Sequence, residues 1–212
     1  MKNNIIYVLD LDRTLIDTDE FIKMLAVSLD LQGYDGDALV EMIEKALTSE
    51  QDINAKAAID SLGEGAWSSV KSYFSEESQK HKLVFDDARI FLEKLKSAGL
   101  PHIILTFGIS KEWQNLKLQT TGLDYIPTII TATRDKSKII NSWKDNHGVY
   151  VPPGFPDMSA SNIVLVDDRP NAFLHPTENL KGYLLDRPME LGHDFKTPQN
   201  VRIINTLAAL EI

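Results

Sequence analysis

The sequence contains no cysteine, which excludes disulfide bonds, thiolate metal sites and cysteine nucleophiles. It also lacks any apolar run approaching the roughly 20 residues that span a bilayer. The N-terminus enters a short strand-like segment without the longer apolar core of a signal peptide. We therefore expect a soluble, cytoplasmic protein with no membrane partner.

Positive charge is also scarce. Lysine and arginine number 22 against 31 aspartate and glutamate residues, a formal net charge of -9. A chain of this sign is not expected to bind nucleic acid or an anionic membrane as its main partner. A small anionic substrate remains compatible, because a bound metal and local backbone amides can invert the field inside one pocket.

Apolar segments of strand character alternate with helical patterns along most of the 212 residues. This alternation predicts an α/β fold with a doubly wound parallel sheet. The length allows one such domain and a modest insertion. Strands are expected at residues 5–9, 102–107, 126–131, 163–166 and 182–186, with a possible edge strand beginning at residue 201.

One long segment interrupts this alternation. Residues 17–83 have the rhythm of helices and no convincing strand, and Asp17 and Glu20 have the spacing of a capping box at the first helix start. The simplest organisation is an α/β core of residues 1–16 and 84–212 with an all-helical subdomain of residues 17–83. The alternative is that these helices pack on the sheet as extra crossovers.

Paired acids follow two of the expected strands. Asp10 and Asp12 come after the first strand, and Asp167 and Asp168 end the fourth. Open α/β sheets bind ligands at the carboxyl ends of their strands. Adjacent carboxylates repel one another unless a cation or a shared proton relieves them, and Mg2+ prefers such oxygen ligands. The sequence therefore predicts a divalent-metal site at this edge.

The Asp-x-Asp-x-Thr pattern from Asp10 to Thr14 resembles the first signature of the haloacid dehalogenase-like phosphohydrolases. Further signatures of that family follow in order: a threonine at the end of the second strand, Thr106, and the paired acids of the fourth. The family's lysine stands near the start of the helix after the third strand, where Lys136 and Lys138 compete. Lys138 is favoured, because a helical side chain there can lean back toward the strand ends.

The resemblance implies a Mg2+-dependent phosphatase that hydrolyses a small phosphorylated metabolite through an aspartyl-phosphate. Asp10 would attack phosphorus, and Asp12 would protonate the leaving oxygen and later activate water. Thr106 and Lys138 would stabilise the phosphoryl oxygens. The metal would be held by Asp10, the backbone carbonyl of Asp12, and Asp167 or Asp168. In the family, a helical cap inserted after the first strand covers the active site, which matches residues 17–83 in position and type.

Other functions are compared on the same residues. A dehalogenase is a poor fit, because halide needs no proton to leave and relatives with that activity lack an acid at the position of Asp12. A response-regulator receiver is rejected by the order of its motifs. A sugar phosphomutase and a non-catalytic phosphate-binding scaffold remain alternatives. Phe107 departs from the family, in which Asn or a small polar residue is common, so the shape of the pocket wall is open. The substrate and the oligomeric state are open as well.

Overall fold

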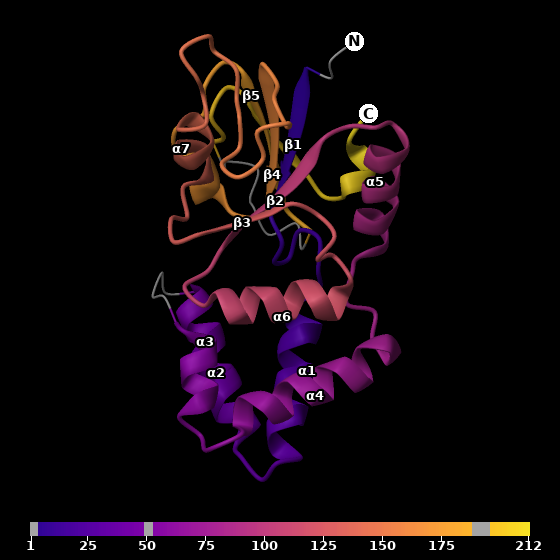
Figure 1. Cartoon of the computed structure of the whole chain (residues 1–212), viewed down its shortest axis with the longest axis vertical. Coiled ribbons are helices and arrows are strands. Elements are labelled where there is room, and N and C mark those ends of the chain that lie inside the picture. Colours follow the sequence, from indigo (N-terminus) through magenta and orange to yellow (C-terminus); the bar gives the residue numbers. More distant parts are fainter. Residues whose placement is uncertain (1–3, 49–52, 188–195) are drawn as a thin grey trace. The chain divides into compact units, whose positions relative to one another are not determined.

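The structure, a computed structural model, describes residues 4–48, 53–187 and 196–212. Its centre is a six-stranded sheet in the order β3-β2-β1-β4-β5-β6, in which every neighbouring pair is parallel (Figure 1). The prediction of a doubly wound parallel sheet is confirmed. The strands are β1 (Ile5–Leu9), β2 (His102–Phe107), β3 (Thr128–Thr131), β4 (Asn162–Asp167), β5 (Leu180–Leu185) and β6 (Val201–Ile204).

Ten helical elements accompany these strands in the part of the chain that the structure describes. Among these helices, none combines the length and apolarity that crossing a membrane would require. The α-helices are α1 (Thr18–Asp30), α2 (Gly36–Thr48), α3 (Ala55–Asp60), α4 (Ala66–Glu77), α5 (Asp86–Ser97), α6 (Lys111–Thr121) and α7 (Lys136–Asn141), and the 3-10 turns are η1 (Ser78–Lys80), η2 (Pro170–Phe173) and η3 (Leu207–Ala209).

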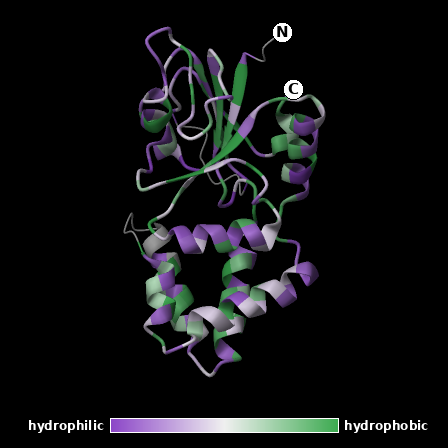
Figure 2. Cartoon of the chain, in the orientation of Figure 1, coloured by the Kyte–Doolittle hydropathy of each residue, from purple (hydrophilic) through white to green (hydrophobic). Residues whose placement is uncertain are grey.

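Both faces of the sheet are buried, as the continuous apolar strands predict. Ile6 and Val8 of β1 belong to a core cluster that includes Ile140 of α7. Tyr7, between them, points to the other face and meets Phe91 of α5 with ring centroids 5.9 Å apart. The helices α5 and α7 accordingly flank the sheet on opposite sides (Figure 1), and Figure 2 shows the central strands coloured as hydrophobic.

The strand order reverses direction at β1. The chain runs from β1 outward through β2 and β3, and then returns to place β4 on the other side of β1. Ligands bind at such a reversal point, outside the carboxyl ends of the strands. Leu9 is in register with Val166, and the N–H of Asp10 donates to the carbonyl of Val166 at 2.9 Å. The register thus brings Asp10 beside Asp167.

The packing divides the chain into two compact units, the first comprising residues 1–15, 85–107 and 126–212, and the second residues 16–84 and 108–125. We expected residues 108–125 in the α/β core, but they pack with the helical unit instead. Trp113 of α6 shares an apolar cluster with Phe21 and Phe74, and its ring meets Phe21 edge-on at 5.4 Å. The role of the helical unit as a cap stays a prediction.

The first helix begins where the sequence predicts. The carboxylate of Asp17 accepts a hydrogen bond from the backbone N–H of Glu20 at 3.0 Å. Within residues 16–84, the described part contains helices and turns and no strand beyond an isolated bridge between Ile16 and Val84. These helices therefore bury their apolar faces in a core of their own, rather than acting as crossovers on the sheet.

Asp87 ties the start of α5 to the end of the chain. Its carboxylate accepts hydrogen bonds from Thr206 Oγ1 at 2.7 Å, from the N–H of Leu207 at 2.8 Å and from Arg187 Nη1 at 2.9 Å. Burial opposes ionisation, but the hydrogen bonds from Arg187, Thr206 and Leu207 outweigh it and lower the pKa of Asp87. Folding therefore favours the ionised carboxylate.

Asp87→Asn should lower the free energy of unfolding by about 1–3 kcal/mol at pH 7, because it removes hydrogen bonds to a charged group. The folded-state pKa lies below the unfolded one, which is near 3.9, so the contribution is complete above about pH 5 and disappears as pH falls through the folded pKa. Urea unfolding at a series of pH values measures this. Asp86→Asn is the matched control, since that carboxylate is exposed and lies 3.5 Å from the guanidinium of Arg89 at the surface. A difference between wild type and Asp87→Asn that is independent of pH would contradict the assignment.

Candidate active site

Three acids converge at the carboxyl ends of β1 and β4. Asp10, Asp167 and Asp168 each place a carboxylate oxygen within 4.8 Å of the others. Asp10 is 5% exposed and Asp167 only 1%. Three oxygen donors at this separation suit a hard divalent cation such as Mg2+. These residues are three of the four predicted for the metal.

A buried lysine lies against two of these acids. Lys136 Nζ contacts Asp10 Oδ1 and lies 2.6 Å from Asp167 Oδ2. The prediction of Lys138 for this place is wrong, because Lys138 is exposed. Lys136 is the first residue of α7, and its side chain lies at the carboxyl ends of the strands. Lys138 comes two positions later, so its side chain points about 200° further around the helix axis.

A network of side chains fixes the backbone on both sides of Lys136. Asp135 caps α7 by accepting from the N–H of Lys138 at 3.1 Å, and it also accepts from Ser137 Oγ at 2.6 Å and pairs with His175 Nδ1. The N–H of His175 donates to Ser137 Oγ at 2.9 Å. His175 lies two residues after η2, which follows β4 along the chain. The network thus joins the lysine's helix to the segment that carries the paired acids.

The charges in this cluster shift one another's titration. Burial, reinforced by the charges of Asp167 and Asp12 and opposed by Lys136, raises the pKa of Asp10 to about 7. Burial, together with Asp10 and Asp167, also raises the pKa of Asp168 well above its usual range. Burial alone would lower the pKa of Lys136, but the two carboxylates outweigh it and raise the pKa. The positive charge of Lys136 therefore does not fully offset the negative charges of the acids, which favours the binding of a further cation.

Thr106 lies at the carboxyl end of β2, where the sequence predicts a phosphate ligand. It is 1% exposed, and its Oγ1 makes no hydrogen bond to any residue that the structure describes. A buried hydroxyl without a partner is destabilising by about 1–3 kcal/mol and calls for an explanation such as a ligand. Contact with a phosphoryl oxygen stays a prediction that this geometry supports.

Asp12 does not join the other three acids. It is partly exposed, as Asp168 is, but its side chain is not a member of the described carboxylate cluster. That position is compatible with a role for its backbone carbonyl, rather than its carboxylate, toward a metal.

Phe107, which departs from the family pattern, lies at the end of β2. The guanidinium of Arg134 packs against its ring, with Cζ 4.3 Å from the ring centroid. The aromatic side chain of Phe107 thus makes a cation–π contact with Arg134.

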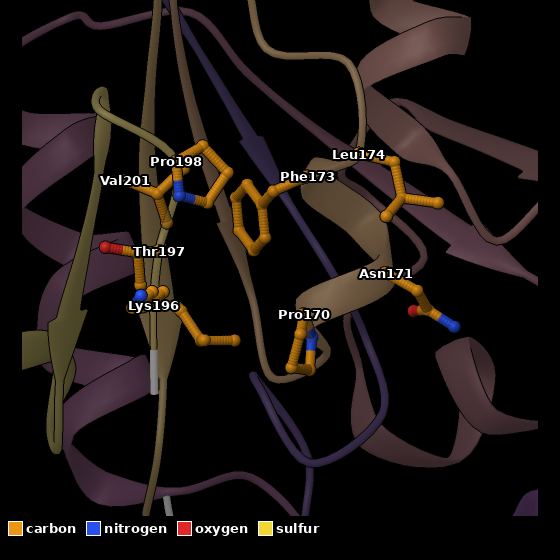
Figure 3. Close-up of a pocket in the computed structure, with 9 residues that line it drawn as sticks. Pro170, Asn171, Phe173, Leu174, Lys196, Thr197, Pro198 and Val201 are labelled. Carbon is orange, nitrogen blue, oxygen red and sulfur yellow. The ribbon is translucent and has the colours of Figure 1, made fainter. Parts of the chain in front are cut away.

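A cavity of about 360 Å³ lies elsewhere in the first unit, beside β5 and β6. Figure 3 shows Phe173 directed toward Pro198 and Val201 across it. None of the acids, Thr106 or Lys136 lines this cavity, so we do not assign the reacting group of a substrate to it. Its lining consists of Pro170, Asn171, Phe173, Leu174, Leu184, Lys196, Thr197, Pro198 and Val201.

We compared the chain with known protein families, curated sequences and solved structures. A family model described as haloacid dehalogenase-like hydrolase matches residues 7–152, more than half of the chain. No curated protein sequence matches. A solved structure of a haloacid dehalogenase-like hydrolase from Burkholderia xenovorans is 17% identical with a TM-score of 0.63, covering 99% of this chain and 100% of that one.

Two other solved structures have related folds. A dehalogenase with an intermediate complex is 18% identical with a TM-score of 0.57, covering 98% of this chain and 96% of that chain. CbbY from Rhodobacter sphaeroides, solved with xylulose-(1,5)bisphosphate, is 12% identical with a TM-score of 0.55, covering 97% of this chain and 95% of that chain. At these identities the similarity establishes the fold and leaves the reaction open.

Lys136→Met should destabilise the metal-free protein by about 3–5 kcal/mol, because it leaves buried carboxylates without their cation. Mg2+ should restore much of this stability, since it supplies the missing positive charge. Urea unfolding at pH 8 with EDTA, and then with Mg2+, measures both effects. Lys138→Met is the matched control and should change stability by no more than about 0.5 kcal/mol. Equal losses in the two variants would contradict the role of Lys136.

Proposed function

Because the chain belongs to the haloacid dehalogenase-like hydrolase family, we propose that it is a Mg2+-dependent phosphatase acting on a small organic phosphate monoester. The observation that carries the proposal is the contact of Lys136 with both Asp10 and Asp167, beside Asp168. A nucleophilic carboxylate, a fixed cation and a set of oxygen ligands are the parts that phosphoryl transfer requires.

Asp10 is the nucleophile in this mechanism. Its carboxylate attacks phosphorus in line with the leaving oxygen, so that an acyl-phosphate bond forms as the ester P–O bond breaks. Asp12 gives its proton to the leaving oxygen. Water then attacks phosphorus, Asp12 takes a proton from it, and the acyl-phosphate bond breaks. Inorganic phosphate leaves, and both carboxyl groups return to their starting states.

Lys136 and Thr106 act on the phosphoryl oxygens. The ammonium group of Lys136 lies at Asp10 and can offset the negative charge of an incoming phosphate. The unpartnered hydroxyl of Thr106 can donate to an equatorial oxygen. Asp10, Asp167, Asp168 and the carbonyl of Asp12 would hold Mg2+, which when bound supplies positive charge that shields the nucleophile from an anionic substrate.

The same residues would serve a sugar phosphomutase, which returns the phosphoryl group to a sugar instead of water. The solved relative that holds xylulose-(1,5)bisphosphate keeps this second activity under consideration. Dehalogenation is disfavoured by Asp12, since expulsion of halide needs no acid. Release of inorganic phosphate separates hydrolysis from transfer, and halide release from a 2-haloacid tests the third activity.

Asp10→Asn should reduce phosphate release by about 10⁴-fold or more, because the amide cannot form the covalent intermediate. The assay is steady-state hydrolysis of p-nitrophenyl phosphate and a panel of phosphometabolites, with Mg2+ and with EDTA. EDTA should abolish the wild-type rate. Asp157→Asn, on an exposed turn, is the control. A folded wild type that releases no phosphate from any compound would overturn the proposal.

Asp12→Asn should affect substrates according to their leaving groups. For an alkyl ester such as glycerol phosphate we expect a loss of about 10²–10⁴-fold, the usual contribution of a general acid. The first turnover of p-nitrophenyl phosphate should be largely spared, because nitrophenolate leaves without a proton. Rapid-quench measurement of that burst, beside alkyl-ester turnover, tests this. Equal losses on both esters would show that Asp12 is not the acid.

A further inference from the structure

Arg187, just beyond β5, reaches back to the loop that follows β1. Its Nε donates to the carbonyl of Arg13 at 3.1 Å and its Nη2 to the carbonyl of Thr14 at 2.8 Å, across 174 and 173 positions of the chain. Its Nη1 is held by Asp87 at 2.9 Å, and its Cζ lies 4.0 Å from the ring centroid of Phe85. The guanidinium is therefore fixed from three directions.

The loop that it holds is strained. Arg13 has a φ of +57°, the one positive value among the non-glycine residues that the structure describes. A residue with a Cβ keeps this conformation only where its surroundings impose it, and such residues concentrate at functional sites. The N–H of Leu15 closes the turn on the carbonyl of Leu11 at 3.0 Å. Asp12 lies inside this turn, directly before the strained residue.

We propose that Arg187 is a positioning residue for Asp12. The guanidinium donates hydrogen bonds to the carbonyls of Arg13 and Thr14, which follow Asp12. These bonds stabilise the strained turn, and the turn directs the carboxyl group of Asp12 toward the leaving oxygen. The role requires a planar group that donates in several directions at once, which a lysine ammonium does not reproduce. This inference rests on the proposed phosphatase function, and on the role of Asp12 within it.

A positioning role predicts a specific dependence on the leaving group. Arg187→Met should reduce turnover of glycerol phosphate by about 10²-fold, the effect of misplacing a catalytic group by about 1 Å. The first turnover of p-nitrophenyl phosphate should fall less than about tenfold, since that step needs no proton from Asp12. Arg187→Lys should behave like Arg187→Met. In Arg187→Ala, millimolar ethylguanidinium should restore part of the alkyl-ester activity.

Two further variants keep the test decisive. In an Asp12→Asn background, adding Arg187→Met should reduce alkyl-ester turnover less than about threefold, because both changes remove the same function. Phe85→Leu removes the ring under the guanidinium but keeps its hydrogen bonds, and should show the same leaving-group dependence more weakly. Arg89→Met, which removes an exposed arginine of α5 that pairs with Asp86 at the surface, is the control and should leave turnover unchanged.

The outcomes separate the two proposals. A wild type that hydrolyses neither ester would overturn the proposed function, and this inference with it. An active wild type in which the Arg187 variants lose equally on both esters would overturn the inference alone, since Arg187 would then serve only folding. The inference alone would also be overturned if Arg187→Met and Asp12→Asn reduced alkyl-ester turnover by independent factors that multiply in the double variant.

Discussion

The contact of Lys136 with Asp10 and Asp167 is the interaction on which the rest of the first unit depends. Three carboxylates within 4.8 Å of one another, two of them buried, repel one another and lose much of their hydration. A single ammonium group, itself buried, offsets part of this in the protein. For that contact to form, β1, β4 and the start of α7 must meet at one point, and the strand order makes them do so.

The supports around this contact come from segments that are distant in sequence. Asp135, Ser137 and His175 fix the start of α7 to the segment after β4, and Arg187 fixes the loop after β1 to the end of β5. In both cases, polar side chains bind backbone groups that are close in sequence to a residue of the proposed mechanism. The site is therefore held by its neighbours at the edge of the sheet, while the apolar strands beneath supply the rigid base.

The helical unit is built on a separate principle. Its core combines apolar residues of α1, α2, α3 and α4 with Trp113 and Leu116 of α6. Within that core the rings of Phe21 and Phe74 stack with their centroids 4.5 Å apart.

The family and the fold are compatible with several reactions, because activity resides in a few residues at the strand ends. In the mechanism that we propose, Asp12 is the acid that distinguishes a phosphate ester from a halide, since only the ester's leaving oxygen needs a proton.

The sequence by itself determined the alternation of strands and helices, the acids at the ends of two strands, and the position of Thr106. Local patterns carry this information, since buried strands are apolar throughout and polar residues at their ends stand out against them. The tertiary structure alone decided between Lys136 and Lys138, assigned α6 to the helical unit, and brought His175 and Arg187 to the site. Those outcomes depend on the direction of a side chain at a helix start and on contacts between residues up to 174 positions apart. Neither direction nor distant contact is visible in the spacing of residues along one chain.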